Sequence, residues 1–180
     1  MKVKEIVLSA AESLGLGEGV SAFFDGGDPC LQREAELLLA CFNRVERSLA
    51  LEYLPLYAED ELLTVDDEVE YSALTYAPVR ILGVENGAGE SVPYKLYPRY
   101  LKAVSGKIKV TYTYTPNAKT IDDDSDFTLP SVLEHGTLAE YCLSEGRLAE
   151  SAVWEQKYKQ EIEGAFRGKK YKRLRSRRWV

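Results

Sequence analysis

The chain has 180 residues, of which 45% are hydrophobic and 29% charged, and its net charge at pH 7 is -6. These values fit one folded domain, or one domain with an inserted module, and they exclude a wholly disordered chain. No apolar run approaches the roughly 20 residues that cross a bilayer, and the first residues lack the apolar centre of a signal peptide, so we expect no membrane contact and a protein that stays in the cytoplasm where it is made.

The first predicted element is a short amphipathic helix at the N-terminus. Its apolar residues recur at helical spacing and are Val3, Ile6, Val7, Ala10 and Leu14. Gly15, Gly17 and Gly19 follow, and glycine disfavours the continuation of a helix. We therefore expect one short helix whose end is marked by these glycines.

A second helix is predicted to begin at Asp28-Pro29, because aspartate is a good N-cap and proline is tolerated at the first helical position. An apolar stripe follows, and the charged residues between its members are predicted to face solvent; they are Arg33, Glu34, Glu36, Arg44, Glu46 and Arg47. The stripe consists of Ala35, Leu38, Leu39, Phe42, Val45 and Leu49. Pro55 should end this helix near Tyr53, since proline cannot continue it.

Between Leu62 and Thr115 the pattern changes from helical to alternating, and turn pairs such as Asn86-Gly87 and Ser105-Gly106 interrupt it. We expect about five short antiparallel strands in this region. The clearest strand covers residues 107–115, and residues 78–84 begin another. One face of the strand at 107–115 is apolar and consists of Ile108, Val110, Tyr112 and Tyr114. We predict that residues 100–104 form a hairpin with this strand across Ser105-Gly106.

An acidic loop at residues 122–126 separates the strands from a second helical section, which begins near Leu129-Pro130 and is interrupted by Gly146. Helical spacing continues to about Phe166, as two helices or as one kinked helix. Clustered carboxylates suit calcium or magnesium, but this loop lacks the glycine and the distal glutamate of an EF-hand. We therefore interpret it as a solvated loop whose charges repel one another.

The end of the chain is strongly basic. Residues 167–180 hold eight basic and no acidic residues, whereas the rest of the chain holds 15 basic and 29 acidic residues. Such a segment can bind phosphates through counterion release or grip carboxylates, and a terminal tryptophan is a useful anchor. It contacts either DNA or an acidic protein groove, or it is a solvated tail. The candidate contact residues of this segment are Arg167, Lys169, Lys170, Lys172, Arg173, Arg175, Arg177, Arg178 and Trp179.

Residues for catalysis are scarce. His135 is the single histidine, and the three cysteines, Cys30, Cys41 and Cys142, form no CxxC pair. No phosphate-binding glycine loop follows a predicted strand. We predict that the protein is not an enzyme and has no catalytic residue, cofactor or metal site, that His135 is structural, and that the cysteines are small buried hydrophobic residues.

These elements predict an α+β fold in which the N-terminal and C-terminal helices form a small bundle with an inserted antiparallel β module. The predicted divisions are N-terminal bundle helices at residues 1–57, the β module at 58–120, C-terminal bundle helices at 121–166 and a basic tail at 167–180.

Three stretches in this order resemble a known family: residues 37–45 (LLLACFNRV), residues 52–56 (EYLPL) and, beyond the β module, residues 136–142 (GTLAEYC), followed by the basic end. The chain resembles the head–tail connector proteins of tailed bacteriophages, also called neck adaptors or head-completion proteins. The resemblance spans most of the chain and rests on the residue pattern of the helices and on their order, since the family has no catalytic signature.

This resemblance implies a structural virion protein that forms a homo-oligomeric ring, expected to be a dodecamer, beneath the portal. Such a ring links the capsid to the tail and helps to retain and pass DNA. The implied partners are other copies of the chain, the portal protein, a downstream neck or tail protein and the passing double-stranded DNA. The implied location is the neck of the virion. Two alternatives from other classes are a regulatory protein that binds nucleic acid through the basic tail and an enzyme of unknown type.

Overall fold

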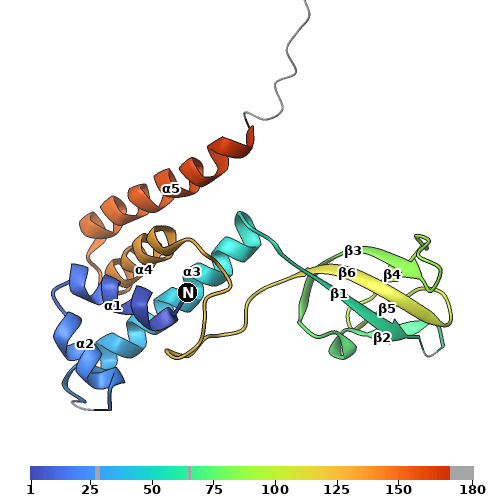
Figure 1. Ribbon diagram of the computed structural model, residues 1–180, viewed down its shortest axis with the longest axis horizontal. Coiled ribbons are helices and arrows are strands. Elements are labelled where there is room, and N and C mark those ends of the chain that lie inside the picture. Colours follow the sequence, from blue (N-terminus) through green and yellow to red (C-terminus); the bar gives the residue numbers. More distant parts are fainter. Residues whose placement is uncertain (27–28, 65, 171–180) are drawn as a thin grey trace, which may run out of the picture. The chain divides into compact units, whose positions relative to one another are not determined.

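The computed structural model describes residues 1–26, 29–64 and 66–170, with side chains as far as residue 165. It confirms the α+β fold: helices at both ends of the chain pack together, and antiparallel strands lie between them in the sequence (Figure 1). Contacts divide the chain into two compact units. We call residues 1–46 with 118–180 the helical unit and residues 47–117 the β unit.

The helical unit begins with α1 (Val3–Ser13) and α2 (Gly17–Phe24). The first helix ends before the glycines, as predicted, whereas α2 was not predicted. Gly15 does end α1, with a left-handed φ of +73°. Gly17 and Gly19, however, lie inside α2, where an added Cβ would come 2.7 Å from Glu12 Cγ and 2.3 Å from Leu31 Cδ1, respectively. These two glycines therefore permit close packing instead of breaking a helix.

A 3-10 turn, η1 (Pro29–Leu31), precedes the long helix α3 (Gln32–Glu52). The predicted capping residue Asp28 lies outside the described residues. The predicted end is confirmed, since α3 stops at Glu52 before Pro55. The predicted stripe is buried except for Leu39, which is half-buried.

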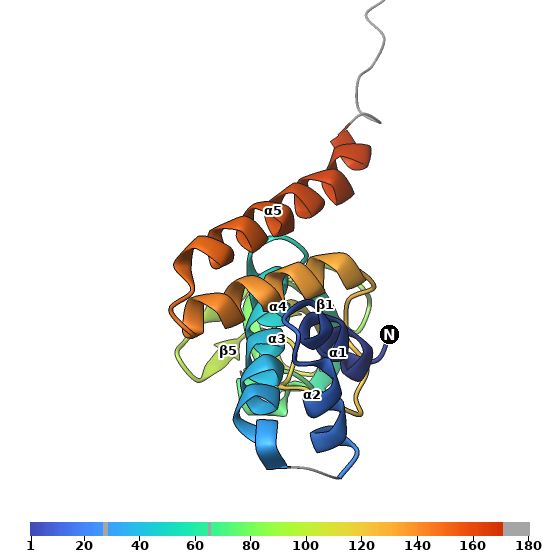
Figure 2. The ribbon, with the colours of Figure 1, turned by 90° about the vertical axis from the view of Figure 1, so that its left-hand side faces the viewer.

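Two helices follow the strands, α4 (Pro130–Ser144) and α5 (Leu148–Lys170), and Gly146 turns the chain between them with a φ of +74°. In the helical unit α4 lies between α5 and the N-terminal helices (Figure 2). Gly136 makes this packing possible, because a Cβ there would come 2.6 Å from Val45 Cγ1 of α3 and 3.0 Å from Tyr158 Cε2 of α5.

The β unit contains two three-stranded antiparallel sheets, with strand orders β1-β6-β3 and β2-β5-β4. The β unit therefore has six strands, whereas about five were predicted. They are β1 (Leu56–Leu63), β2 (Glu68–Glu70), β3 (Pro78–Asn86), β4 (Lys95–Leu96), β5 (Tyr100–Lys102) and β6 (Lys107–Tyr114), with a 3-10 turn η2 (Tyr71–Ala73) after β2. Both sheets contribute to one apolar core, formed by Val69, Leu74, Ile81, Val84, Leu101, Ile108, Val110 and Tyr112.

The alternation of β6 is confirmed, because Ile108, Val110 and Tyr112 are buried. The predicted hairpin between residues 100–104 and β6 is wrong. β6 pairs with β1 and β3, whereas β5 pairs with β2 and β4. Thr64 explains the change of sheet: its backbone N–H donates to Gly106 O at 3.0 Å and its hydroxyl donates to Val104 O at 3.0 Å. The turn at 104–106 is thus tied to the end of β1 and does not close a hairpin.

None of the described helices is long and apolar enough to cross a membrane.

Candidate interaction surfaces

The basic residues predicted from sequence lie at and beyond the end of α5. Arg167, Lys169 and Lys170 belong to the last turns of that helix, and the structure does not describe their side chains. The remaining predicted contacts, Lys172, Arg173, Arg175, Arg177, Arg178 and Trp179, lie outside the described residues. The contacts of this basic end therefore remain a prediction.

The acidic charge is concentrated in the helical unit. Its residues 1–46 and 118–165 include eight basic and 19 acidic residues, a net charge of -11, whereas the β unit has seven basic and ten acidic residues, a net charge of -3. All eight remaining basic residues lie in 166–180, the end of the same helical unit. An acidic body with a basic end favours contact between unlike regions of neighbouring molecules.

The acidic loop holds the N-terminus of the chain. Asp124 forms one ion pair with the N-terminal ammonium of Met1 at 3.3 Å and a second with Lys2 Nζ at 2.9 Å. Backbone bonds reinforce this contact: Val3 N donates to Asp123 O at 3.1 Å, and Ser125 N donates to Met1 O at 2.9 Å. The hydrogen bond from Lys2 lowers the pKa of Asp124. The loop is exposed, as the prediction of a solvated loop requires, but its charges do not only repel one another, because Met1 and Lys2 neutralise part of them.

Glu46 of α3 anchors the same loop from inside, which contradicts its predicted place on the solvent-exposed face of the helix. Its side chain is buried, and Oε1 accepts hydrogen bonds from Ser125 Oγ at 2.6 Å and from Asp126 N at 2.8 Å. Burial raises the pKa of this carboxyl, although both hydrogen bonds act in the opposite direction. No group of three or more potential metal ligands occurs among the described residues.

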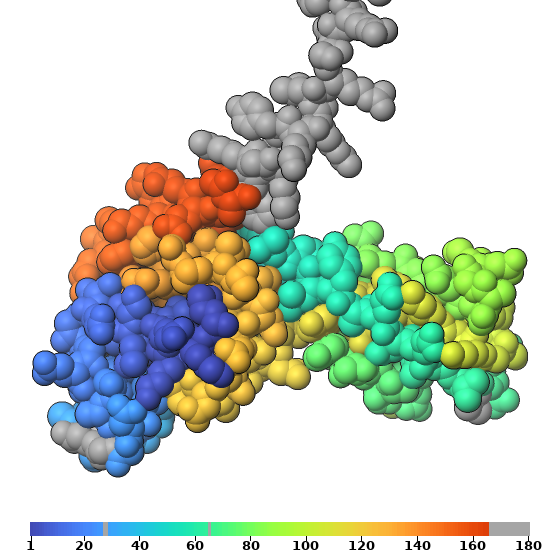
Figure 3. All heavy atoms as spheres, in the orientation of Figure 1, coloured from blue at the N-terminus to red at the C-terminus, as the bar shows by residue number. Residues whose placement is uncertain are grey.

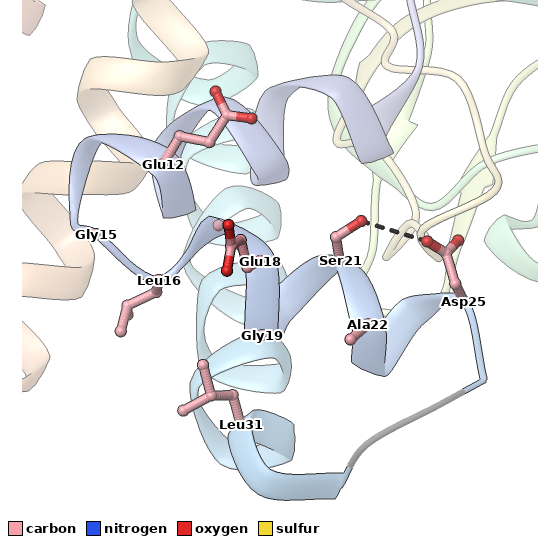
Figure 4. A pocket seen from close by; sticks show the side chains of 10 residues that line it. Glu12, Gly15, Leu16, Glu18, Gly19, Ser21, Ala22, Asp25 and Leu31 are labelled. Carbon is pink, nitrogen blue, oxygen red and sulfur yellow. Dashed lines mark hydrogen bonds between the residues drawn. The ribbon is translucent and has the colours of Figure 1, made fainter.

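A hollow of about 940 Å³ opens between α1, α2 and η1, and we call it the α1–α2 groove (Figure 4). Leu16, Ala22 and Leu31 supply its apolar side chains, and the glycine backbone around Gly17 and Gly19 completes the wall.

The charged groups that line the α1–α2 groove are all acidic. Asp25 is already paired, with Lys4 Nζ at 2.6 Å and Ser21 Oγ at 3.3 Å. The exposed carboxylates of Glu12 and Glu18 form no ion pair within the part of the chain that the structure describes. The groove therefore combines apolar contacts with two available negative charges.

A second, smaller hollow of about 450 Å³ lies between the start of α4 and the end of α5. Near the turn that joins these helices, Leu143, Leu148 and Val153 are 52%, 66% and 55% exposed. The space-filling view shows α5 on the surface of the helical unit (Figure 3).

The turn between β4 and β5, residues 95–100, forms what we call the hairpin tip. Tyr97 N donates to Tyr100 O at 2.9 Å, and the two rings stack with centroids 4.7 Å apart and planes inclined by 14°. Leu96 and Tyr97 are nevertheless 55% and 38% exposed. The tip thus presents apolar and aromatic surface on a defined backbone.

Two basic residues of this tip have no carboxylate partner in the described part of the chain. Residues 91–121 contain six basic residues and no acidic residue. Four of the six form ion pairs, namely Lys102 with Glu68, Lys107 with Glu61, Lys109 with Glu59 and Lys119 with Asp126. Lys95 and Arg99 form none among the described residues, and each lies two residues away from the exposed Tyr97 in the sequence.

His135 lies in the contact between two helices, and two of the three cysteines are buried. His135 lies between α4 and α5, with Nδ1 3.2 Å from Glu161 Oε1 and its ring centroid 5.5 Å from that of Trp154. Cys41 and Cys142 are buried as predicted, and burial raises the pKa of Cys41 to about 11. Cys30 is exposed, which contradicts the prediction, because the turn η1 places it at the surface.

No protein-family model matches the chain, and no curated protein matches it.

Proposed function

We propose that this chain is a structural virion protein of a tailed bacteriophage, a head–tail adaptor that forms a ring beneath the portal. The observation that carries the proposal is the division of the chain into a helical unit built from both of its ends and a β unit inserted between them. A closed ring of identical subunits needs two different, complementary surfaces on each copy. Two units of different architecture and charge provide such surfaces.

The charge distribution supports the same proposal. Net charges of -11 on residues 1–46 with 118–165 and -3 on the β unit disfavour adhesion of DNA to the body of the protein. DNA would then pass a wall of the ring without sticking to it. The basic end, which follows α5 in the chain, is left to bind the portal protein or the DNA, and the part of the β unit that does not contact another copy is left to meet the next neck or tail protein.

The test uses the purified full chain, the portal protein and electron microscopy. We expect rings of the chain on the portal, and loss of copurification when residues 167–180 are deleted. A matched control keeps the composition of residues 167–180 but scrambles their order. If the scrambled end binds as well as the native one, the contact depends on charge alone. Unchanged binding of the deletion variant would refute the role of the basic end, and failure of the full chain to join the portal would refute the adaptor.

A second candidate function is a regulatory protein that binds nucleic acid, favoured by the eight basic residues in 167–180. A clamp of this kind should lose roughly a thousandfold or more in DNA affinity between about 50 and 200 mM salt, because each phosphate contact releases a counterion. An adaptor should instead bind DNA weakly at both salt concentrations and associate with itself or with the portal. Fluorescence anisotropy with a labelled duplex separates the two functions.

A further inference from the structure

We propose that the hairpin tip of one copy docks into the α1–α2 groove of a second copy of this chain. This inference rests on the self-association in the proposed function and assigns it to named residues.

The hairpin tip has the composition of an interface anchor. Exposed aromatic side chains near the centre of a contact supply much of its binding energy, and flanking polar groups shield them from water. Tyr97 is held by its stack on Tyr100 and by the backbone bond to it, so little side-chain freedom is lost on docking. Lys95 and Arg99 lie on either side of it in the sequence and have no carboxylate partner among the described residues.

The α1–α2 groove offers the complementary set of groups. Leu16, Ala22 and Leu31 provide apolar contact for the tyrosine ring, and the hollow of about 940 Å³ exceeds the space that one such side chain needs. Glu12 and Glu18, which form no ion pair with the described residues, match Lys95 and Arg99 in number and are opposite in charge. Within the described part of the chain, no basic residue belongs to the lining of the groove, and the nearby Lys4 is paired with Asp25.

The two halves of this contact belong to different surfaces, so the interface is heterologous. Each copy offers one tip and one groove, and the contact can repeat from head to tail until a ring closes. Charge pairs at the edge of such an interface accelerate association and make it sensitive to salt.

The basic end of the chain is the competing occupant of the groove. Within one helical unit α2 and the end of α5 lie on opposite sides (Figure 2). The experiment separates binding of the basic end, whether of the same chain or of another copy, from binding of the tip.

The experiment reverses the charges of each half and measures self-association of the full chain by sedimentation velocity. The tip variant is Lys95→Glu with Arg99→Glu, and the groove variant is Glu12→Lys with Glu18→Lys. We expect each to weaken association at least about tenfold, since attraction becomes repulsion. An equimolar mixture of the two variants, or a single chain with all four substitutions, should associate again, because every tip then meets a groove of opposite charge.

Two controls make the outcome specific. Arg47→Glu with Arg80→Glu changes the net charge as much as the tip variant, at exposed positions of the β unit outside the tip, and should leave association unchanged. Circular dichroism checks that each variant is folded. Restored association in the mixture also shows that neither variant was merely misfolded.

Several results would overturn the inference. One is self-association of the wild type that neither charge reversal weakens, a result that leaves the proposed adaptor intact. Another is association that persists in the tip variant but disappears when residues 171–180 are deleted, which would assign the groove to the basic end. A third is a wild type that stays monomeric at all concentrations, and the adaptor itself falls only if that chain also fails to bind the portal.

Discussion

At the scale of single residues, Glu46 is the buried ionisable group with the clearest consequence. Its carboxyl is 1% exposed, Oε1 holds Ser125 and Asp126, and Oε2 has no hydrogen-bond partner among the described residues. The carboxyl of Glu46 thus fixes the loop to α3, although its burial destabilises the ionised form of this group.

Glu46→Gln should change how stability depends on pH. Because burial raises the pKa of Glu46 above its ordinary value of 4.5, folding favours the protonated form. The stability that Glu46 contributes is complete below that value and is lost as the pH rises through the folded pKa. Glutamine does not ionise, so the free energy of unfolding of the variant, relative to wild type, should improve between about pH 4 and pH 7.

Chemical denaturation at several pH values measures this difference. Glu36→Gln is the matched control, since it removes the same charge from an exposed position of α3. A difference between Glu46→Gln and wild type that stays constant over this pH range would contradict the predicted role of burial.

At the scale of elements, the contact of α3, α4 and α5 depends on the missing side chain of Gly136. Gly136→Ala should lower the free energy of unfolding by about 1–3 kcal/mol, because the new methyl group overpacks the contact. The methyl group would lie 2.6 Å from Val45 Cγ1 and 3.0 Å from Tyr158 Cε2. Urea unfolding followed by circular dichroism provides the measurement.

Gly164→Ala on α5 is the control for this prediction. A Cβ there meets no atom within 4 Å, and alanine favours a helix over glycine by up to about 1 kcal/mol. We expect this variant to be as stable as wild type or more so. Equal destabilisation by both substitutions would mean that close packing at Gly136 is not the cause.

At the scale of the whole molecule, the two units should respond separately to a change inside one of them. Tyr112 lies in the β unit core, where its hydroxyl donates to Asp60 Oδ2 at 2.7 Å and accepts from Tyr76 N at 3.1 Å. Burial, together with Asp60, raises the pKa of Tyr112 to about 12, so its hydroxyl keeps its proton at neutral pH.

Tyr112→Phe should destabilise the β unit by about 1–3 kcal/mol, because the half-buried Asp60 Oδ2 and Tyr76 N each lose a hydrogen bond. Deuterium uptake measured by mass spectrometry should rise within residues 47–117 and stay unchanged in α4. Tyr57→Phe serves as control, since Tyr57 is 65% exposed on β1. Equal increases in both units would show that they unfold as one.

The sequence alone was sufficient for features that depend on near neighbours. The apolar stripe of α3 and the alternation of β6 follow from repeats of 3.6 and two residues, so their buried faces could be read directly. The stop of α3 before Pro55 and the turn at Gly146 follow from the backbone limits of single residues. The α+β plan results from these local patterns.

Features that depend on distant partners were decided only by the tertiary structure. In the sequence Gly17 and Gly19 are typical helix breakers. In the folded chain Glu12 and Leu31 pack against them, so that only glycine fits at these positions of α2. β5 joins β2 because Thr64 at the end of β1 ties the turn at 104–106, a contact about 40 residues away in the chain.

The proposed contact between the hairpin tip and the α1–α2 groove also depends on residues that are distant in the sequence. Six basic residues between 91 and 121 look alike in the sequence, but four of them meet carboxylates in the folded chain, which leaves Lys95 and Arg99 at the tip. Local sequence determines which backbone shape each segment prefers, whereas pairing and burial of charges depend on residues that only the fold brings together.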